Sequence, residues 1–418
     1  MRVILFTGKG GVGKTTTAAA TAVWAARQGV KTLVMSTDAA HSLGDALGVD
    51  LSPSRAPDGD PLDTDAVVEV EPGLSALHIS VPHALRRSWR SVQDYLLAAL
   101  GTLGIDSVVA DELTSLPGAE ELVALLELRA QVGSGRWDLV VVDCAPTAET
   151  LRLLALPEAL AWHLDRLVPA QRGLLRTLRP AAAAATGLPL PGADVLQTIR
   201  RWKEHLSEVQ AILAADSTSV RLVMTPEHVV VAESRRTLTS LGLYGFTVDQ
   251  VVVNRVFPLA DPRDGSTPDP WRASWNAAQE RGLAEVRDSF EPLPVVVTPY
   301  LAQEPIGVDA LAELAAARTG DPTAHQVEAL LAPSEHRGLT LERDGAEYLL
   351  VLPLPLVSAA EVDLKRRGDE LLVVVGDHRR VLSLPSVLRR CTVTGASVRD
   401  AALRVRFAPD ERMWPQHG

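Results

Sequence analysis

A glycine-rich segment near the N-terminus constrains the fold of this chain more than any other feature. Gly8–Thr15 reads Gly-Lys-Gly-Gly-Val-Gly-Lys-Thr, the apolar run Val3–Phe6 precedes it, and the Ala-rich stretch Thr16–Arg27 follows it. The segment fits the G-x-x-x-x-G-K-[ST] pattern, which binds phosphate when a strand precedes it and a helix follows it. A Gly-rich turn without a ligand is a remote alternative. The segment therefore predicts a phosphate-binding loop (P-loop) in an α/β domain.

The same loop predicts which residues hold a nucleotide. Its backbone N–H groups are expected to curl around the phosphates at a helix N-terminus, where the helix dipole favours anions. Lys14 is expected to reach the β- and γ-phosphates, and the hydroxyl of Thr15 to ligate Mg²⁺. The cofactors predicted from the loop are therefore ATP and Mg²⁺. The nucleotide-binding residues predicted here are Gly8, Lys9, Gly10, Gly11, Val12, Gly13, Lys14, Thr15 and Thr16.

Two aspartates follow apolar runs and are candidates for the chemistry. Asp143 ends the run that begins at Leu139, which places it at the carboxyl edge of the sheet beside the loop, where it can hold Mg²⁺ through a water. An aspartate at that position alone is often a helix cap, but the upstream loop favours the metal role. Asp38 either orients or deprotonates the attacking water or caps the next helix, and the residues leave both open. From the residues alone, Lys9 is expected to be a solvated lysine of the loop rather than a functional residue.

The pattern of apolar runs predicts two domains. Short runs rich in Val, Ile and Leu alternate with helical segments, which indicates a mostly parallel sheet with helices on both sides over residues 1–330. Helical inserts are expected near 82–134 and 151–212. Between 335 and 410 short segments separated by turn signals predict an all-β, sandwich-like domain. The strands expected in the first domain are Val3–Phe6, Thr32–Met35, Leu139–Val142, Val220–Met224, Val251–Val253 and Val295–Val297. Those expected in the second are Leu339–Leu341, Tyr348–Leu352, Val362–Arg366, Glu370–Val375, His378–Ser383 and Leu403–Phe407.

Composition excludes several classes of partner. The formal net charge of −11 argues against a nucleic-acid-binding protein, because phosphate backbones need concentrated Lys and Arg. The two cysteines, Cys144 and Cys391, form no cluster of the kind that binds zinc. Neither a secretion signal nor a membrane-spanning stretch is recognisable in the sequence. We therefore expect a cytoplasmic protein without a zinc site.

Three segments together resemble the arsenite-pump ATPase family, which includes the ATPases that target tail-anchored membrane proteins. These segments are Lys9–Thr16, Ser36–Leu43 and Asp143–Thr147. Thr150–Pro157, Leu116–Gly118 and Val253–Arg255 are similar too, and the resemblance covers residues 1 to about 325. The β domain resembles the α-crystallin-like domain that some bacterial members carry at the C-terminus.

The resemblance implies a homodimer that closes over two nucleotides. Lys9 then corresponds to the signature lysine that crosses to the partner's nucleotide and neutralises charge in the transition state. Asp38 corresponds to the aspartate of the first switch that activates water. The segment from Asp143 corresponds to the second switch, which senses the γ-phosphate, although Ala148 and Glu149 replace the Gly and His that are usual there.

The resemblance also implies which residues contact the adenine base. In addition, this chain lacks cysteine motifs that are found in two groups of relatives. Asn254 corresponds to a residue that contacts adenine, and Pro299 and Tyr300 to the loop that closes over the base. The Cys-x-x-Cys that holds zinc between subunits in the eukaryotic targeting factors is missing. So are the spaced cysteines that a soft arsenic site requires.

The expected function is an ATP-hydrolysing dimeric switch that binds or targets hydrophobic segments of client proteins or of a membrane-protein partner. One alternative is a positioning or partition ATPase that acts on membrane or nucleoid, which needs a basic face or a basic amphipathic end that residues 408–418 do not offer. A subunit of an arsenite pump is another alternative, but this chain lacks the spaced cysteines that an arsenic site requires. A small-molecule enzyme that uses the loop for phosphoryl transfer is a further alternative.

Overall fold

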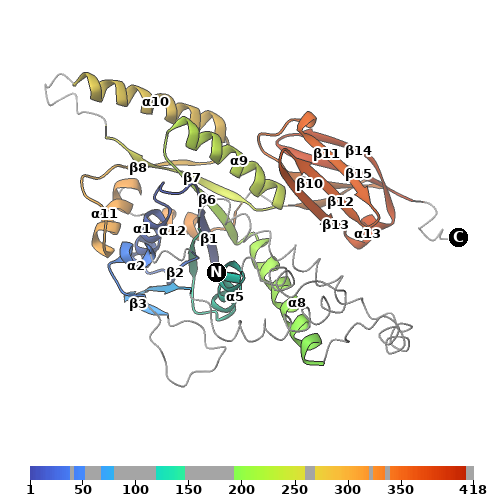
Figure 1. Ribbon diagram of the computed structural model, residues 1–418, viewed down its shortest axis with the longest axis horizontal. Helices are drawn as coiled ribbons and strands as arrows, with labels where there is room; N and C mark the ends of the chain where they lie inside the picture. Colours follow the sequence, from blue (N-terminus) through green and yellow to red (C-terminus); the bar gives the residue numbers. More distant parts are fainter. Residues whose placement is uncertain are drawn as a thin grey trace, which may run out of the picture.

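The computed structural model describes residues 1–37, 42–51, 67–79, 119–145, 193–258, 269–319, 323–334 and 339–410. Most of these residues belong to one eight-stranded sheet with helices on both faces, followed by a separate β domain (Figure 1). The sheet order is β3-β4-β2-β5-β1-β6-β7-β8, and every neighbouring pair is parallel except β3 with β4. The strands are β1 (Arg2–Thr7), β2 (Thr32–Ser36), β3 (Val68–Glu71), β4 (Leu74–His78), β5 (Leu139–Asp143), β6 (Thr218–Met224), β7 (Val248–Val256) and β8 (Val295–Pro299).

Two sets of helices cover the two faces of this sheet. Alternation along β1 shows the division, because Val3 and Leu5 join one buried cluster while Ile4 and Phe6 join the other. The first face packs against α5 (Ala119–Gly133), α8 (Ala193–Leu213), α9 (His228–Tyr244) and α10 (Pro270–Phe290). The second face packs against α1 (Lys14–Arg27), α2 (Ser42–Leu47), α11 (Val308–Thr319) and α12 (Ala324–Leu331). Strands covered on both faces must be apolar throughout, which is why the central strands read as continuous apolar runs.

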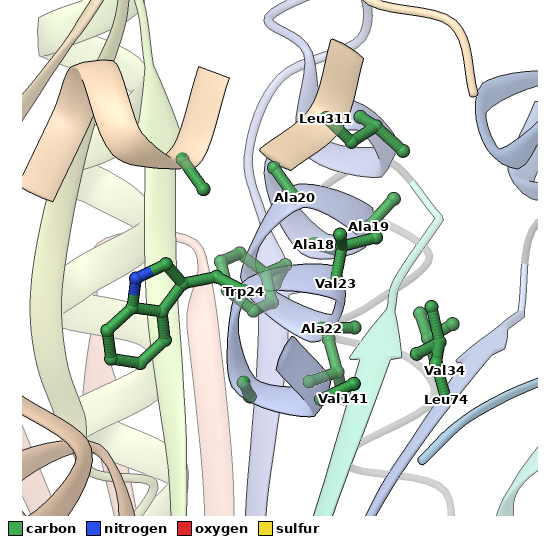
Figure 2. Close-up of a cluster of buried hydrophobic side chains, with 14 of the residues drawn as sticks. Ala18, Ala19, Ala20, Ala22, Val23, Trp24, Val34, Leu74, Val141 and Leu311 are labelled. Carbon is green, nitrogen blue, oxygen red and sulfur yellow. The ribbon is translucent and has the colours of Figure 1, made fainter. Parts of the chain in front are cut away.

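The Ala-rich helix α1 fixes the position of the loop that precedes it. Figure 2 shows that the small apolar side chains of this helix lie close to Val34, Leu74, Val141 and Leu311. These small side chains are Ala18, Ala19, Ala20, Ala22 and Val23. Alanine allows the helix backbone to approach the sheet closely, and each of these side chains is at most 1% exposed. The helix begins at Lys14, two residues earlier than the sequence predicts. Its N-terminus is thereby held rigidly at the carboxyl edge of the sheet.

The predicted fold class is confirmed, and two strands of the sheet were missed. All six strands expected in the sheet are present. The missed strands are β3 and β4, an antiparallel pair that turns at Gly73, where φ is 83°. Partly exposed β3 alternates apolar and acidic residues, so it lacks the continuous apolar run that identified the central strands. Of the predicted helical inserts, the described parts are α5 and α8, and the rest lies outside the described residues.

The C-terminal β domain consists of two antiparallel sheets around their own buried cluster. One sheet has the order β14-β15-β10-β9 and the other β11-β12-β13. Its elements are β9 (Thr340–Asp344), β10 (Glu347–Pro353), η2 (Ala359–Glu361), β11 (Val362–Arg367), β12 (Glu370–Val375), β13 (His378–Ser383), α13 (Ser386–Arg389), β14 (Cys391–Arg399) and β15 (Ala402–Pro409). Six strands match the sequence prediction. β14 was missed because it is polar, mostly exposed, and interrupted by an irregularity between Val393 and Gly395.

Within the described residues, no helix combines the length and the apolar character needed to cross a bilayer.

Candidate nucleotide-binding site

The loop between β1 and α1 adopts a shape that only glycine allows at three positions. A Cβ on Gly8 would lie 2.0 Å from the backbone oxygen of Val223, so the loop passes directly against β6. Gly11 and Gly13 have φ of 80° and 89°, in the left-handed region that side chains disfavour. Gly13 is also the N-cap of α1 and has no side chain, so the first N–H groups of the helix remain available to a bound anion.

The two lysines of the loop have different partners. Lys14 is 7% exposed, and its Nζ donates to the backbone oxygen of Lys9 at 3.3 Å, so its charge lies over the loop. Lys9 turns outward, with a side chain that is 40% exposed and an Nζ that is 2.9 Å from Oε2 of Glu233 on α9. Only Lys14 is therefore positioned to meet phosphates held by the same loop.

A cluster of hard oxygen ligands lies beside the loop where β1, β2 and β5 end. Asp143 is fully buried, and strand register places it opposite Phe6 of β1 and Ser36 of β2. Its Oδ2 accepts hydrogen bonds from Thr15 Oγ1 at 2.8 Å and from Ser36 Oγ at 3.1 Å. Ser42, at the start of α2, places its Oγ 3.4 Å from Thr15 Oγ1. Hydroxyl and carboxylate oxygens converging on one point suit Mg²⁺.

The sequence predicted Thr15 and Asp143 at this cluster but not the two serines. Ser36 and Ser42 flank the segment in which Asp38 lies, and the strand-end position of Ser36 next to Asp143 was the signal available for it. Asp38 itself lies outside the described residues, and its role stays a prediction.

Hydrogen bonds join the ends of β2 and β5, from which the two predicted switch segments depart. The N–H of Thr37 donates to the backbone oxygen of Asp143 at 2.9 Å, and Oγ1 of Thr37 accepts from the N–H of Ala145 at 3.1 Å. Cys144 donates its N–H to the backbone oxygen of Phe6 at 3.1 Å. Residues 38–41 and 146–150, including Thr147, lie outside the described residues. Within the described residues, these hydrogen bonds tie the ends of the two strands to one another.

Asn254, near the end of β7, supports the loop through a hydrogen bond, which we call the brace. Its Nδ2 donates to the backbone oxygen of Val12 at 2.8 Å, and both residues are buried. A Cβ on Gly13 would lie 2.2 Å from the same nitrogen, so Asn254 also requires a glycine in the loop. Sequence reasoning did not foresee this contact. The predicted contact of Asn254 with adenine stays a prediction.

Exposed aromatic rings gather where β7 and β8 end, two and three strands from β1. Tyr300 stacks on Phe257 with ring centroids 4.9 Å apart and an angle of 18° between the planes, and Trp275 of α10 meets Phe257 edge-on at 5.2 Å. Gln279 fixes the backbone of Phe257 with two hydrogen bonds of 2.8 and 3.0 Å. Phe257 and Tyr300 are 37% and 46% exposed, so part of the pair remains accessible from solvent. The sequence predicted Pro299 and Tyr300 here, but not Phe257 or Trp275.

Comparison with known proteins was made against family models and curated sequences. Residues 1–318 match the model of the anion-transporting ATPases, and residues 345–407 match the model of the HSP20-like domain found in ArsA. The chain is 34% identical over 415 residues to the "Putative arsenical pump-driving ATPase" of Chlorobaculum tepidum, covering 97% of this chain and 96% of the relative. It is 40% identical over 416 residues to an uncharacterized protein of Streptomyces coelicolor, covering both chains fully. To the ATPase get3 of Aspergillus terreus it is 32% identical over 317 residues, covering 74% of this chain and 88% of the relative.

Proposed function

The chain belongs to the anion-transporting ATPase family and hydrolyses ATP, and from this premise we propose that it acts as a cytoplasmic homodimeric switch that binds hydrophobic segments of client proteins. In this proposal each subunit binds one nucleotide, and closure of the dimer over both nucleotides changes the surface that meets the client.

The P-loop and the oxygen cluster have separate tasks in hydrolysis. The loop N–H groups and Lys14 would hold the phosphates, while Thr15 and Asp143 would hold Mg²⁺, with Asp143 acting through a water. Mg²⁺, when bound, supplies positive charge that neutralises the phosphate oxygens. Asp38 would orient or deprotonate the attacking water.

The difference between the partners of the two loop lysines is the observation that carries the proposal of a dimer. Lys14 covers its own loop, whereas Lys9 extends toward the surface and meets Glu233. A lysine directed away from its own loop is placed to neutralise charge at another subunit's nucleotide. This supports catalysis in trans, as the family resemblance implies.

The base would be recognised where β7 and β8 end. Planar aromatic faces attract planar bases, and the stacked pair of Phe257 and Tyr300 offers such a face at the same edge of the sheet as the loop. Pro299 and Tyr300 would form the loop that closes over adenine. Asn254 would then serve twice, through its brace on Val12 and through a contact with the base.

A role in driving an arsenical pump, which the names of some relatives state for those proteins, is the second candidate. The two cysteines of the chain argue against an arsenic site within one subunit. Cys144 lies in the core of the main sheet and Cys391 in the core of the β domain, both almost fully buried. A trivalent arsenic site requires several thiolates that converge.

Two experiments test the proposal. Lys9→Ala is expected to reduce ATP turnover, and mixing it with Asp38→Asn subunits should restore part of the activity, because each variant supplies the group that the other lacks. Mixtures that show only the average of the two variants would exclude catalysis in trans. Turnover raised by hydrophobic peptides supports client binding, whereas turnover raised by DNA or anionic vesicles supports a partition-type ATPase instead.

A further inference from the structure

Helix α9 joins the core of the ATPase sheet to the core of the β domain. Val231, near its N-terminus, is fully buried in the cluster beneath the main sheet. Leu243, near its C-terminus, is fully buried in the cluster of the β domain. Figure 1 shows α9 running from the main sheet to the edge of the β domain. One rigid element therefore has an end in each core.

The C-terminal half of α9 lies in direct contact with the β domain. A Cβ on Gly242 would lie 2.8 Å from the backbone oxygen of Pro353 and 2.9 Å from Cδ of Pro355, so the helix backbone touches the end of β10. Thr239 donates its hydroxyl to the backbone oxygen of Pro355 at 3.0 Å. Close backbone contact of this kind leaves the helix little freedom to slide over the β domain.

Arg380 of β13 completes this contact. Its Nη1 donates to the backbone oxygen of Leu243 at 2.7 Å, and the same guanidinium lies beside Gly245, which ends the helix. The last carbonyl groups of a helix lack partners within the helix and carry partial negative charge, so a cation is favoured there. The β domain thus holds α9 by its C-terminal end.

The N-terminal half of α9 holds the outward lysine of the P-loop. Glu233 is ten residues before Leu243, about 15 Å along the helix axis. Its Oε2 lies 2.9 Å from Nζ of Lys9. A shift or rotation of α9 imposed at the β domain therefore changes the position of the carboxylate that pairs with Lys9.

We propose that the β domain regulates ATP hydrolysis through α9, because α9 places Glu233 where its carboxylate retains Lys9 within its own subunit. Glu233 is a positioning residue in this proposal, which rests on the proposed action of Lys9 in trans. While the pair persists, Lys9 is held back from the partner's nucleotide. When the β domain moves, for example on meeting a client, α9 moves with it and Lys9 is released.

The ion pair between Lys9 and Glu233 is partly exposed, as a pair that must break easily should be. The side chains of Lys9 and Glu233 are 40% and 32% exposed, and solvent weakens an ion pair of this kind. Such pairs shift an equilibrium by at most about fivefold. The restraint on Lys9 is therefore weak enough to be released by a small movement of the helix.

Steady-state ATP turnover of the full chain, without added client, tests the proposal. Glu233→Gln removes the charge of the carboxylate and is expected to raise turnover about two- to fivefold. Arg380→Ala loosens the β domain from α9 and is expected to raise turnover by a similar factor. The double variant should be no faster than Glu233→Gln alone, because both changes release the same lysine.

Arg379→Ala is the matched control, because Arg379 is next to Arg380 on β13 but its side chain is exposed. Turnover by Arg379→Ala should equal that of the unchanged chain. If Arg380→Ala fails to fold, Thr239→Val supplies the same test by removing only the hydroxyl that meets Pro355. Additive effects of the two changes, or a fall in turnover in Glu233→Gln, would overturn the proposal.

Lys9→Ala separates this proposal from the proposed function. If Lys9→Ala lowers turnover but Glu233→Gln changes nothing, the restraint by Glu233 is wrong and catalysis in trans stands. If Lys9→Ala leaves turnover unchanged, both proposals fall. If Glu233→Gln raises turnover only when Lys9 is present, both are supported.

Discussion

The brace between Asn254 and the P-loop leads to a prediction about nucleotide affinity. Asn254→Ala leaves the buried backbone oxygen of Val12 without its 2.8 Å donor, and Asn254→Asp places a second acceptor against it. An unsatisfied buried polar group costs about 1–3 kcal/mol. If that cost falls on the phosphate-binding form of the loop, affinity for Mg²⁺-ATP should fall by a factor of about 5 to 150.

The choice of ligand distinguishes the brace from recognition of the base. We would measure the dissociation constants of Mg²⁺-ATP and of inorganic triphosphate by titration calorimetry for both variants. A brace acts on the phosphates, so the two ligands should lose the same factor. Direct recognition of adenine would weaken ATP alone.

Asn276→Ala is the matched control, because Asn276 lies on α10 and is partly exposed. Its affinities should match those of the unchanged chain. Urea unfolding of all three variants shows whether the unsatisfied carbonyl lowers the free energy of unfolding of the whole protein instead. Inorganic triphosphate bound equally well by Asn254→Ala and by the unchanged chain would refute the reasoning.

Two further predictions concern the loop and the opposite end of the sheet. Gly8→Ala should weaken ATP binding at least tenfold in the same calorimetric assay, because its Cβ would lie 2.0 Å from the backbone oxygen of Val223. Gly10→Ala should weaken ATP binding less than Gly8→Ala, because a Cβ on Gly10 meets no protein atom within 4 Å. Asp249→Asn should lower the free energy of unfolding by about 3 kcal/mol, because Asp249 is the ion-pair partner of buried Arg2 and of Arg221. Urea unfolding measures this free energy, and an unchanged midpoint would contradict the prediction.

Much of the site follows from local sequence, because its geometry is local. The G-x-x-x-x-G-K-[ST] spacing fixes a strand, a turn and a helix N-terminus within a few residues. It thereby places Lys14 over the loop and Thr15 beside Asp143, and the roles expected of both residues stay predictions. The burial of Asp143 beside the loop follows from its place at the end of an apolar run. In a parallel sheet, all such strand ends meet at one edge.

Three strands, β3, β4 and β14, were not predicted from the sequence. β3 and β14 alternate or are polar, because one side of each faces solvent, and their pairing depends on the neighbouring strand rather than on their own residues. The aromatic pair at Phe257 and Tyr300 also needs the sheet order, which brings the ends of β7 and β8 together.

By itself the sequence determined that this chain has a glycine-rich loop between a strand and a helix, a mostly parallel sheet and a second all-β domain. The spacing of apolar residues and of loop glycines is a local property, so it can be read directly from the sequence. Only the tertiary structure decided what surrounds the loop. Asn254 reaches Val12 across 242 residues of sequence, and Glu233 reaches Lys9 from a helix that also contacts the β domain. Such contacts depend on which strands become neighbours and how a helix lies across them, and no local pattern encodes either.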